Sequence, residues 1–280
     1  MEQKWIVEKV DDGMDRTFIQ ATTYQMRNPF GQFADGCATE LDVHCYFQHA
    51  FAAQLCPVGG TVLDVCCGRG LLIPFLRYGG KPPSLYVGVD IHPANARWKD
   101  GRDPRRESQT KADWGFKLVF VQSNVAKMAA PILAAVTEKP FDLIVYTSSI
   151  EHMQPSDQQQ SLKECRDLAG ADTKLYLTCP VSEEGHDGYD AQYAAHVYEP
   201  TRSELLEWLS EASWEVESSI GISTKSTHFR KVLRSEALKT AEHLYSVMPR
   251  AQALPSIAAL YPECATEMAY VCRRTNGKVH

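Results

Sequence analysis

The sequence predicts an α/β fold: a doubly wound, mostly parallel sheet of seven strands, with helical elements near the N-terminus and late in the chain that are placed to act as lids. Two observations predict it. Runs rich in Val, Ile, Leu and Phe alternate with segments of helical periodicity across residues 60–218, as in parallel sheets with crossover helices. The first run, 61–65, leads into a turn with Gly68 and Gly70, and parallel sheets commonly hold ligands at such turns.

Length and composition favour a single domain that is soluble. At 280 residues the chain can bury a sizeable core. The balance of 29 basic against 35 acidic residues gives a net charge of −6, which provides no electrostatic footprint for sequence-independent binding to nucleic acid. The chain begins without the apolar core of a signal peptide, and no apolar run approaches the roughly 20 residues of a membrane span. We therefore expect a cytoplasmic protein without membrane contact.

The nine cysteines are expected to be small core residues in a reducing compartment. Their number is odd, and no pair has C-x-x-C spacing. Neither a disulfide framework nor a metal site is predicted from them.

Residues 1–55 are predicted to form an N-terminal cap or lid. Residues 1–38 are polar and contain turn sequences, whereas 39–55 has helical spacing and is closed by Pro57. Tyr24, Arg27 and Phe30 are candidates to fold over a pocket, although simple packing is the more ordinary role of aromatic residues in such a segment.

The main domain is predicted over residues 56–280. Its first half has strands at 61–65, 85–89, 117–122 and 141–146, with helices at 71–78 and about 126–136. Residues 99–115 are highly charged and indicate a solvated loop. The basic cluster there is an alternative site for an anionic substrate, but neighbouring acids partly neutralise it; its members are Arg102, Arg105 and Arg106.

The second half of the domain continues the alternation. A helix starts at Pro155 and ends at Gly170, and a strand follows at 174–178. After a His- and Tyr-rich loop at 181–199, a capping box at 201–204 opens a helix. The remaining elements are a strand at 214–218, a helical piece at about 228–248 inside an insertion at 221–262, and a last strand at 269–273.

Polar residues stand where several of these strands end. Asp64 lies at the exit of the first strand, where a carboxylate would repel a pyrophosphate but accept a hydrogen bond from an amino group. Asp90 ends the second strand, a position that commonly binds ribose hydroxyls, although capping of the next helix is an alternative. With Asn124 and Tyr146 they are predicted to lie along one edge of the sheet.

Five ordered segments together resemble a known family. They are VLDVCCGRG at 62–70, VGVD at 87–90, FVQSNV at 120–125, FDLIVYTSSIEHM at 141–153 and LYLTCPV at 175–181. In these segments, and in HVYEPTRSELLEWLSEASWEVE at 196–217, the chain resembles class I S-adenosylmethionine-dependent methyltransferases over about residues 40–218. The resemblance implies the Rossmann-like methyltransferase fold and S-adenosyl-L-methionine as cofactor.

The resemblance also implies roles for single residues. Asp64 would hold the methionine amino group, Asp90 the ribose hydroxyls, and Asn124 the adenine. The whole implied cofactor-binding set is Asp64, Cys66, Gly68, Gly70, Asp90, Ile91, Asn124, Val125 and Tyr146. Cys66 departs from the family, in which Gly is more usual, and we interpret it as a tolerated variant.

The catalytic residue is harder to predict, because methyl transfer needs mainly alignment and desolvation. His152, beside Glu151, is the best candidate for a base, since the ordinary pKa of His suits that role near neutrality; a structural role for the pair is the alternative. The loop residues His186, Tyr189, His196 and Tyr198 are weaker candidates. Glu151 and His152 could also bind a metal with the loop histidines, but their spacing is no recognised metal motif, and no metal site is predicted.

The predicted function is methyl transfer to an oxygen or nitrogen atom of a small molecule by in-line displacement. The alternatives are methylation of RNA or protein, and a non-catalytic partner subunit with the same fold. The weak basic patch counts against the first alternative, and the intact Asp64, Gly68, Gly70 and Asp90 count against the second. A nicotinamide oxidoreductase is disfavoured because the first glycine of G-x-G-x-x-G is missing. Oligomeric state is not predicted.

Overall fold

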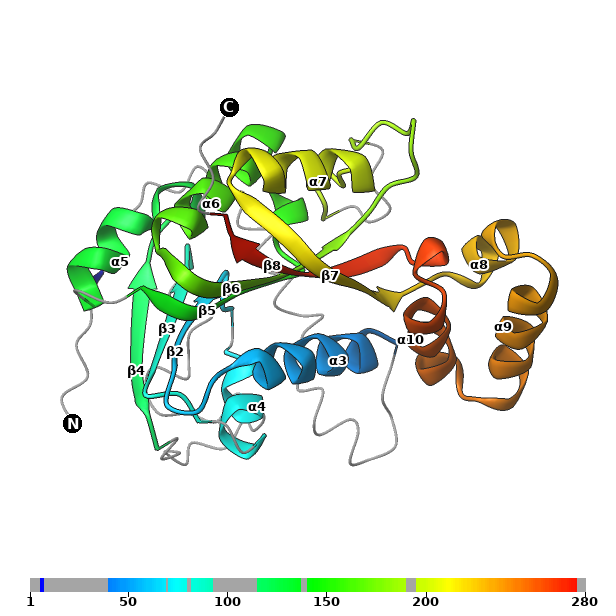
Figure 1. Ribbon diagram of the computed structural model, residues 1–280, viewed down its shortest axis with the longest axis horizontal. Coiled ribbons are helices and arrows are strands. Elements are labelled where there is room, and N and C mark those ends of the chain that lie inside the picture. Colours follow the sequence, from blue (N-terminus) through cyan, green and yellow to red (C-terminus); the bar gives the residue numbers. More distant parts are fainter. Residues whose placement is uncertain are drawn as a thin grey trace.

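The computed structural model describes residues 6–7, 40–68, 70–79, 82–92, 115–136, 140–189 and 195–275. They form a sheet of eight strands in the order β1-β4-β3-β2-β5-β6-β8-β7, with helices on both faces (Figure 1). Only the pairings of β8, with β6 and β7, are antiparallel. The strands are β1 Ile6–Val7, β2 Thr61–Val65, β3 Leu85–Asp90, β4 Lys117–Gln122, β5 Phe141–Thr147, β6 Ala169–Pro180, β7 Trp214–Ser223 and β8 Glu267–Arg274.

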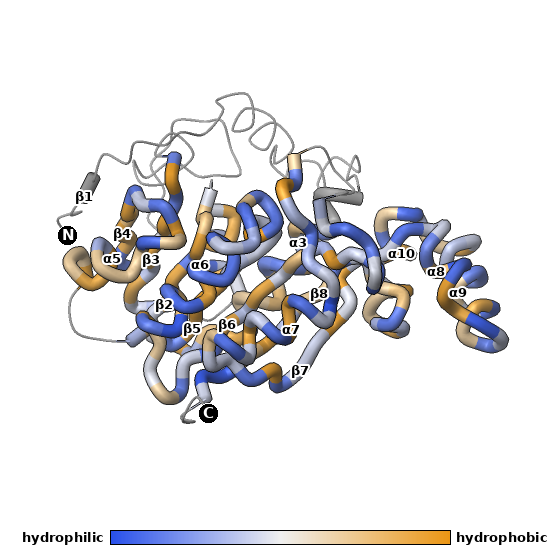
Figure 2. The backbone as a smooth tube through the Cα atoms, turned by 90° about the horizontal axis from the view of Figure 1, so that it is seen from above, coloured by the Kyte–Doolittle hydropathy of each residue, from blue (hydrophilic) through white to orange (hydrophobic). Residues whose placement is uncertain are grey.

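Helices cover the sheet in two layers. One layer contains α5, α6 and α7, and the other contains α3 and α4 (Figure 1). Seen from above, α5 and the segment with α8, α9 and α10 lie at opposite ends of the molecule (Figure 2). The α-helices are α3 Glu40–Leu55, α4 Leu72–Tyr78, α5 Ala129–Val136, α6 Pro155–Asp167, α7 Arg202–Glu211, α8 Ser226–Val232, α9 Ser235–Val247 and α10 Arg250–Leu260. Short 3-10 helices are η2 Val125–Lys127, η3 Ile150–His152 and η4 Pro262–Cys264.

The core lies on both sides of the sheet because successive strand residues point to opposite faces. In β2, Leu63 and Val65 join one buried cluster, whereas Val62 joins the other with Leu72 and Leu76 of α4. These residues are fully or almost fully buried. The apolar runs that predicted the strands are therefore the ones that hold both helical layers.

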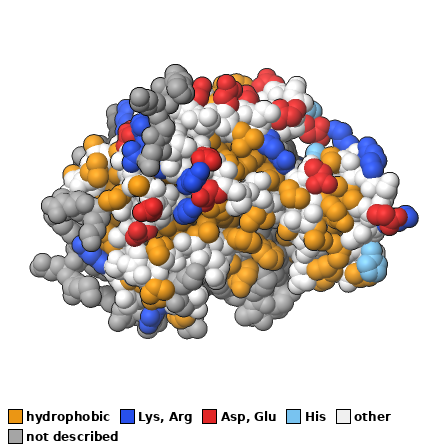
Figure 3. Space-filling view, in the orientation of Figure 1, with side chains coloured by type: hydrophobic (Ala, Val, Ile, Leu, Met, Phe, Trp, Pro, Cys, Tyr) orange, Lys and Arg blue, Asp and Glu red, His pale blue; other side chains and the backbone are white. Residues whose placement is uncertain are grey.

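The α8–α10 segment forms a lobe at one end of the sheet. α10 packs on β7 and α3, whereas α8 and α9 extend beyond the sheet (Figure 1). Hydrophobic side chains reach the surface over this lobe and across the middle of the face shown in Figure 3. The lobe has its own buried cluster, which consists of Phe229, Leu233, Ala241, Leu254, Ile257 and Cys264.

The predicted fold class is confirmed, and three details differ. All seven predicted strands are present, and β1 adds an eighth at the edge, parallel to β4. β6 starts at Ala169, because Ala169 pairs with Phe141 across a register shift although its segment lacks apolar alternation. The late insertion holds three helices instead of one. The chain becomes extended at Leu233 and Arg234 without a Gly or Pro to mark that break, and a further helix, α10, follows Pro249.

Several predictions lie outside the described residues. They concern most of the N-terminal cap, including Tyr24, Arg27 and Phe30, and most of the charged loop with Arg102, Arg105 and Arg106. Within the described part, no helix combines the length and the apolar character that crossing a membrane requires. No disulfide joins the eight cysteines in that part of the chain.

Candidate functional site

The turn after β2 is built from residues in left-handed backbone conformations. Cys66, Gly68 and Gly70 have φ of 56°, 47° and 71°. The turn is closed by a hydrogen bond from Gly70 N to Cys67 O at 2.8 Å and is held to β3 by one from Cys67 N to Val89 O at 2.9 Å. Glycine adopts such φ values without steric cost, so Gly68 and Gly70 suit the turn, whereas the Cβ of Cys66 makes the same conformation strained.

Asp90, at the end of β3, holds this turn in place. Its Oδ2 accepts a hydrogen bond from Gly68 N at 2.9 Å, and its Oδ1 accepts one from His92 N at 2.8 Å. Burial raises the pKa of Asp90, and these two hydrogen bonds oppose that rise. The residue predicted to bind ribose hydroxyls is therefore also the residue that fixes the Gly-containing turn.

Asp64 lies one residue before the end of β2 and is only 3% exposed. Its Oδ2 accepts a hydrogen bond from the Tyr86 hydroxyl at 2.5 Å. Burial raises the pKa of Asp64 to about 7; the Tyr86 hydrogen bond opposes this, and the charge of Asp90 adds to it. A cationic group beside these two carboxyls would favour their charged forms, which fits the ammonium group that the sequence assigns to this position.

The other predicted cofactor residues differ in what their side chains do. Asn124 caps η2, because its Oδ1 accepts a hydrogen bond from Ala126 N at 2.9 Å; a carbonyl oxygen has a second lone pair for a ligand. Val125 is buried, and Ile91 is half-buried beside Asp90. Tyr146 is fully buried, and its hydroxyl donates to Ser161 Oγ of α6 at 3.2 Å, so its side chain belongs to the core.

Glu151 and His152 lie in η3, directly after β5. The main-chain oxygen of Glu151 accepts hydrogen bonds from Val197 N at 2.8 Å and Tyr198 N at 3.1 Å, which hold the loop before α7 against η3. His152 Nδ1 donates to Ala195 O at 2.9 Å. Burial lowers the pKa of His152 to about 4, so the argument from an ordinary imidazole pKa, which made it the best candidate base, does not apply in the folded protein.

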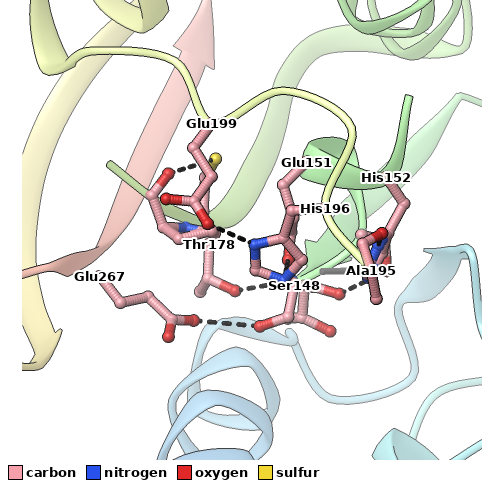
Figure 4. Close-up of polar contacts among 12 residues, drawn as sticks. Ser148, Glu151, His152, Thr178, Ala195, His196, Glu199 and Glu267 are labelled. Carbon is pink, nitrogen blue, oxygen red and sulfur yellow. Dashed lines mark hydrogen bonds and ion pairs between the residues drawn. The ribbon is translucent and has the colours of Figure 1, made fainter. Parts of the chain in front are cut away.

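Of the loop candidates, only His196 joins this pair (Figure 4). His196 Nδ1 contacts Glu199 Oε1 at 2.6 Å, and His196 Nε2 lies 4.0 Å from Glu151 Oε1. Burial raises the pKa of Glu151 well above its ordinary value, and the carboxyls of Glu267 and Glu199 raise it further. The other loop candidates contact different residues: His186 lies near Glu183, Tyr189 bonds Gln154 and Tyr198 bonds Glu204.

A second polar group beside Glu151 was not predicted. Ser148, with φ of 41°, follows β5, and its Oγ donates to Glu267 Oε1 of β8 at 3.0 Å (Figure 4). From α3, Gln48 Nε2 donates to Ser148 Oγ at 2.7 Å, and His44 Nε2 lies 2.5 Å from Glu267 Oε1. The spacing of four residues between His44 and Gln48, which puts both on one helix face, is the only signal in the sequence for this group.

The predicted cofactor residues and this polar group lie at one edge of the sheet. β2 and β5 are parallel neighbours, with Val65 opposite Tyr146, so the turn after β2 and the residues after β5 leave the sheet side by side. Burial raises the pKa of Cys66, and the charges of Asp90, Asp64 and Glu151 all add to that rise. The turn after β2 and the residues after β5 are therefore close enough for their charges to interact.

Comparisons with known proteins agree with this geometry. The family model described as a methyltransferase domain matches residues 43–219. Comparison with curated proteins gives no significant match.

Solved structures share the fold at low sequence identity. A chain of the complex between the Haloferax volcanii Trm112 methyltransferase activator and a methyltransferase has 14% identity and a TM-score of 0.55, with 95% of this chain and 99% of that chain covered. A Burkholderia thailandensis 1,6-didemethyltoxoflavin-N1-methyltransferase, bound to its substrate and S-adenosylhomocysteine, has 18% identity and a TM-score of 0.50, with 95% and 94% covered.

The [4+2]-cyclase SpnF is also similar, with 17% identity, a TM-score of 0.51, and 82% and 80% of the two chains covered. At these identities the likeness establishes the fold and leaves the reaction to be argued from the site.

Proposed function

Because the chain belongs to the methyltransferase-domain family, we propose that it transfers a methyl group to an oxygen or nitrogen atom of a small molecule. Its methyl donor is S-adenosylmethionine. The observation that carries the proposal is the hydrogen bond from Gly68 N to Asp90 Oδ2, which draws the left-handed turn after β2 against an acid at the end of β3. Both elements of the cofactor site thus meet at one sheet edge.

When bound, the cofactor supplies a methyl group on an electrophilic sulfonium. The residues of this chain bind and orient it. Asp64 receives the charged amino group, Asp90 the ribose hydroxyls, and Asn124 faces the adenine. In-line attack by the acceptor then depends on alignment, which rigid strand ends favour.

The polar group after β5 supports a small acceptor. Gln48 comes from α3 and Glu267 from β8, while Ser148 follows β5 and its neighbour Glu151 lies in η3. Of these four residues, all but Ser148 are buried. Side chains buried this deeply would contact a small polar molecule more readily than a macromolecular surface. The net charge of −6 gives no support for nucleic acid as the acceptor. Cytoplasmic location is proposed on the absence of disulfides among the described cysteines.

Calorimetric titration with S-adenosylmethionine tests the cofactor site. We expect binding at sub-millimolar ligand, and at least about tenfold weaker binding by Asp64→Ala, because the ammonium loses its charged partner. Asp172→Asn, which changes an exposed acid on β6, is the matched control and should bind as the unaltered protein does. Absence of binding, or equal binding by Asp64→Ala, would refute the proposed cofactor site.

The acceptor class is tested with cofactor labelled on the methyl group. We expect label in small molecules when the enzyme is incubated with a metabolite extract. Parallel incubations with total RNA and with protein distinguish the macromolecular alternative. Label found only in RNA or protein would overturn the small-molecule proposal and leave the methyltransferase assignment intact.

A further inference from the structure

Three potential metal ligands converge next to the cofactor turn. One carboxylate oxygen of Glu151 and one ring nitrogen each of His152 and His196 lie within 4.8 Å of one another. Ligands that share one divalent cation at about 2.0–2.2 Å lie about 2.8–3.6 Å apart in octahedral or tetrahedral geometry, so closure of this group by about 1–2 Å would complete a site. We propose that Glu151, His152 and His196 bind a divalent transition-metal ion.

Both imidazoles are oriented as metal-binding histidines usually are. His152 Nδ1 donates to the Ala195 carbonyl at 2.9 Å, and His196 Nδ1 contacts the buried Glu199 carboxylate at 2.6 Å. An oxygen acceptor on one ring nitrogen fixes the tautomer that presents the other nitrogen to a metal. In both rings Nε2 is thus the candidate ligand atom, and His196 Nε2 is the atom that faces Glu151 Oε1 at 4.0 Å.

Glu151 gives an independent indication of a missing ligand. The residue is 1% exposed, and its Oε2 is buried without a hydrogen-bond partner among the described residues. A buried carboxylate oxygen without a partner is costly, and coordination of a cation would remove that cost. The 4.0 Å separation between Glu151 Oε1 and His196 Nε2 is too long for a hydrogen bond, and it would shorten to about 2.8–3.6 Å when both atoms bind one ion in octahedral or tetrahedral geometry.

The ligand types select the class of metal. Two imidazoles and one carboxylate suit Mn²⁺, Fe²⁺, Co²⁺ or Zn²⁺, whereas Mg²⁺ and Ca²⁺ prefer oxygen ligands alone. Three protein ligands leave coordination positions open for a substrate. The ion would lie after β5, beside the cofactor turn, where the acceptor must approach.

The position of the ion restricts the chemical class of the methyl acceptor. This step rests on the proposed function. The cation would take a hydroxyl oxygen of the acceptor and lower the pKa of that hydroxyl. The hydroxyl proton leaves to water, a lone pair of the oxygen forms the new bond to the methyl carbon, and the bond from methyl to sulfur breaks. The positive sulfonium becomes a neutral thioether, so the charges balance. The acceptor class is therefore a hydroxyl-bearing small molecule.

Metal binding is tested directly on the full chain after treatment with a chelator and dialysis. Titration with Co²⁺, followed by its visible absorption, should show one equivalent bound in a nitrogen- and oxygen-ligated environment. His196→Gln should bind Co²⁺ at least tenfold more weakly, and Glu199→Gln about tenfold more weakly through loss of ring positioning. His243→Gln, which alters an exposed histidine on α9, is the control and should bind as the unaltered protein does.

Titration of the unaltered protein tests the proposal even if a variant fails to fold. Circular dichroism shows whether each variant is folded. No stoichiometric binding of Co²⁺, Mn²⁺ or Zn²⁺ overturns the proposal, and so does equal affinity in a folded His196→Gln variant. Chelation should reduce methyl transfer at least tenfold, with recovery on added Mn²⁺, and leave S-adenosylmethionine affinity within twofold. Cofactor binding without metal binding refutes the metal site alone, whereas metal binding without cofactor binding refutes the proposed function alone.

Discussion

At the scale of single residues, the binding role proposed for Asp64 conflicts with the stability of the fold. Its carboxyl is buried in β2 and accepts a hydrogen bond from the Tyr86 hydroxyl of the neighbouring strand β3. Burial raises its pKa to about 7, from an ordinary value of 3.8. The folded protein therefore holds the proton on Asp64 more tightly than the unfolded chain does, and ionising Asp64 opposes folding.

This conflict gives a prediction for Asp64→Asn, which removes the charge and keeps a side-chain oxygen for Tyr86. The destabilisation by Asp64 grows as pH rises from about 4 to about 7 and is constant above that. The free energy of unfolding of Asp64→Asn should therefore exceed that of the unaltered protein at pH 8, by about 4 kcal/mol at most, and by much less near pH 4.

Urea unfolding at the two pH values measures this difference, with Asp172→Asn as the exposed control. An equal effect of Asp64→Asn at both pH values would contradict the explanation. Asp64→Asn should also bind S-adenosylmethionine more weakly, since the proposed binding of the ammonium group needs the negative charge on Asp64 that burial disfavours.

The residues at the strand ends were predictable, but their partners were not. Asp64 and Asp90 follow apolar runs in the sequence, so their place at the sheet edge could be inferred. The contact between Asp64 and Tyr86 depends on register: Tyr86 lies opposite Val62 and reaches diagonally to the acid two residues on. The meeting of His196 with Glu151 likewise depends on two main-chain hydrogen bonds that no local pattern specifies.

At the scale of elements, the packing of α10 on β7 depends on Gly221. A Cβ atom at this position would lie 2.1 Å from the main-chain oxygen of Ala258 and 2.6 Å from its carbonyl carbon. The absence of a side chain in β7 lets the backbone of α10 approach the strand directly. Since the obstructing atoms belong to a helix backbone, no rotamer change can relieve the overlap.

We therefore expect Gly221→Ala to displace α10 and to lower the free energy of unfolding by about 2–3 kcal/mol. Ser219→Ala, an exposed substitution in the same strand, should change it by less than about 0.5 kcal/mol. Chemical denaturation of both variants provides the measurement. If Gly221→Ala proves as stable as Ser219→Ala, the close approach of helix and strand is not a constraint.

Elements with strong apolar runs were predicted to within a few residues, and elements without them were not. The buried strands and the capping box at Thr201 and Glu204 have local signals, and the structure contains both hydrogen bonds of that box. β1 has two residues and is a strand only because it pairs with β4. The break between α8 and α9 has no Gly or Pro to mark it, whereas the break between α9 and α10 has a local signal, because Pro249 holds Met248 in an extended conformation.

At the scale of the whole molecule, the lobe and the sheet have separate buried clusters. The lobe cluster contains Phe229, whose side chain is completely buried. The centroid of its ring lies 5.8 Å from that of the Tyr245 ring. Separate clusters allow one part to open while the other stays folded. The lobe is joined to the sheet mainly through α10, so α8 and α9 should be the less stable part.

Phe229→Ala tests this independence. Removing the ring should destabilise the lobe by about 3–5 kcal/mol, and amide hydrogen exchange should accelerate in α8 and α9. Exchange in β2, β3 and β5 should remain unchanged, and so should affinity for S-adenosylmethionine. Equal acceleration across the sheet would show that lobe and sheet unfold as one unit.

The strand order also has a consequence for when the enzyme becomes complete during translation. β8, the last strand, lies between β6 and β7, so β7 has no partner on the sheet until the ribosome has made residues 267–274. Glu267, which accepts the hydrogen bond from Ser148, is the first residue of β8 and is therefore made at the same stage of translation. A nascent chain can thus form the turn after β2 before it can form the contact between Ser148 and Glu267, which must wait until β8 has been made.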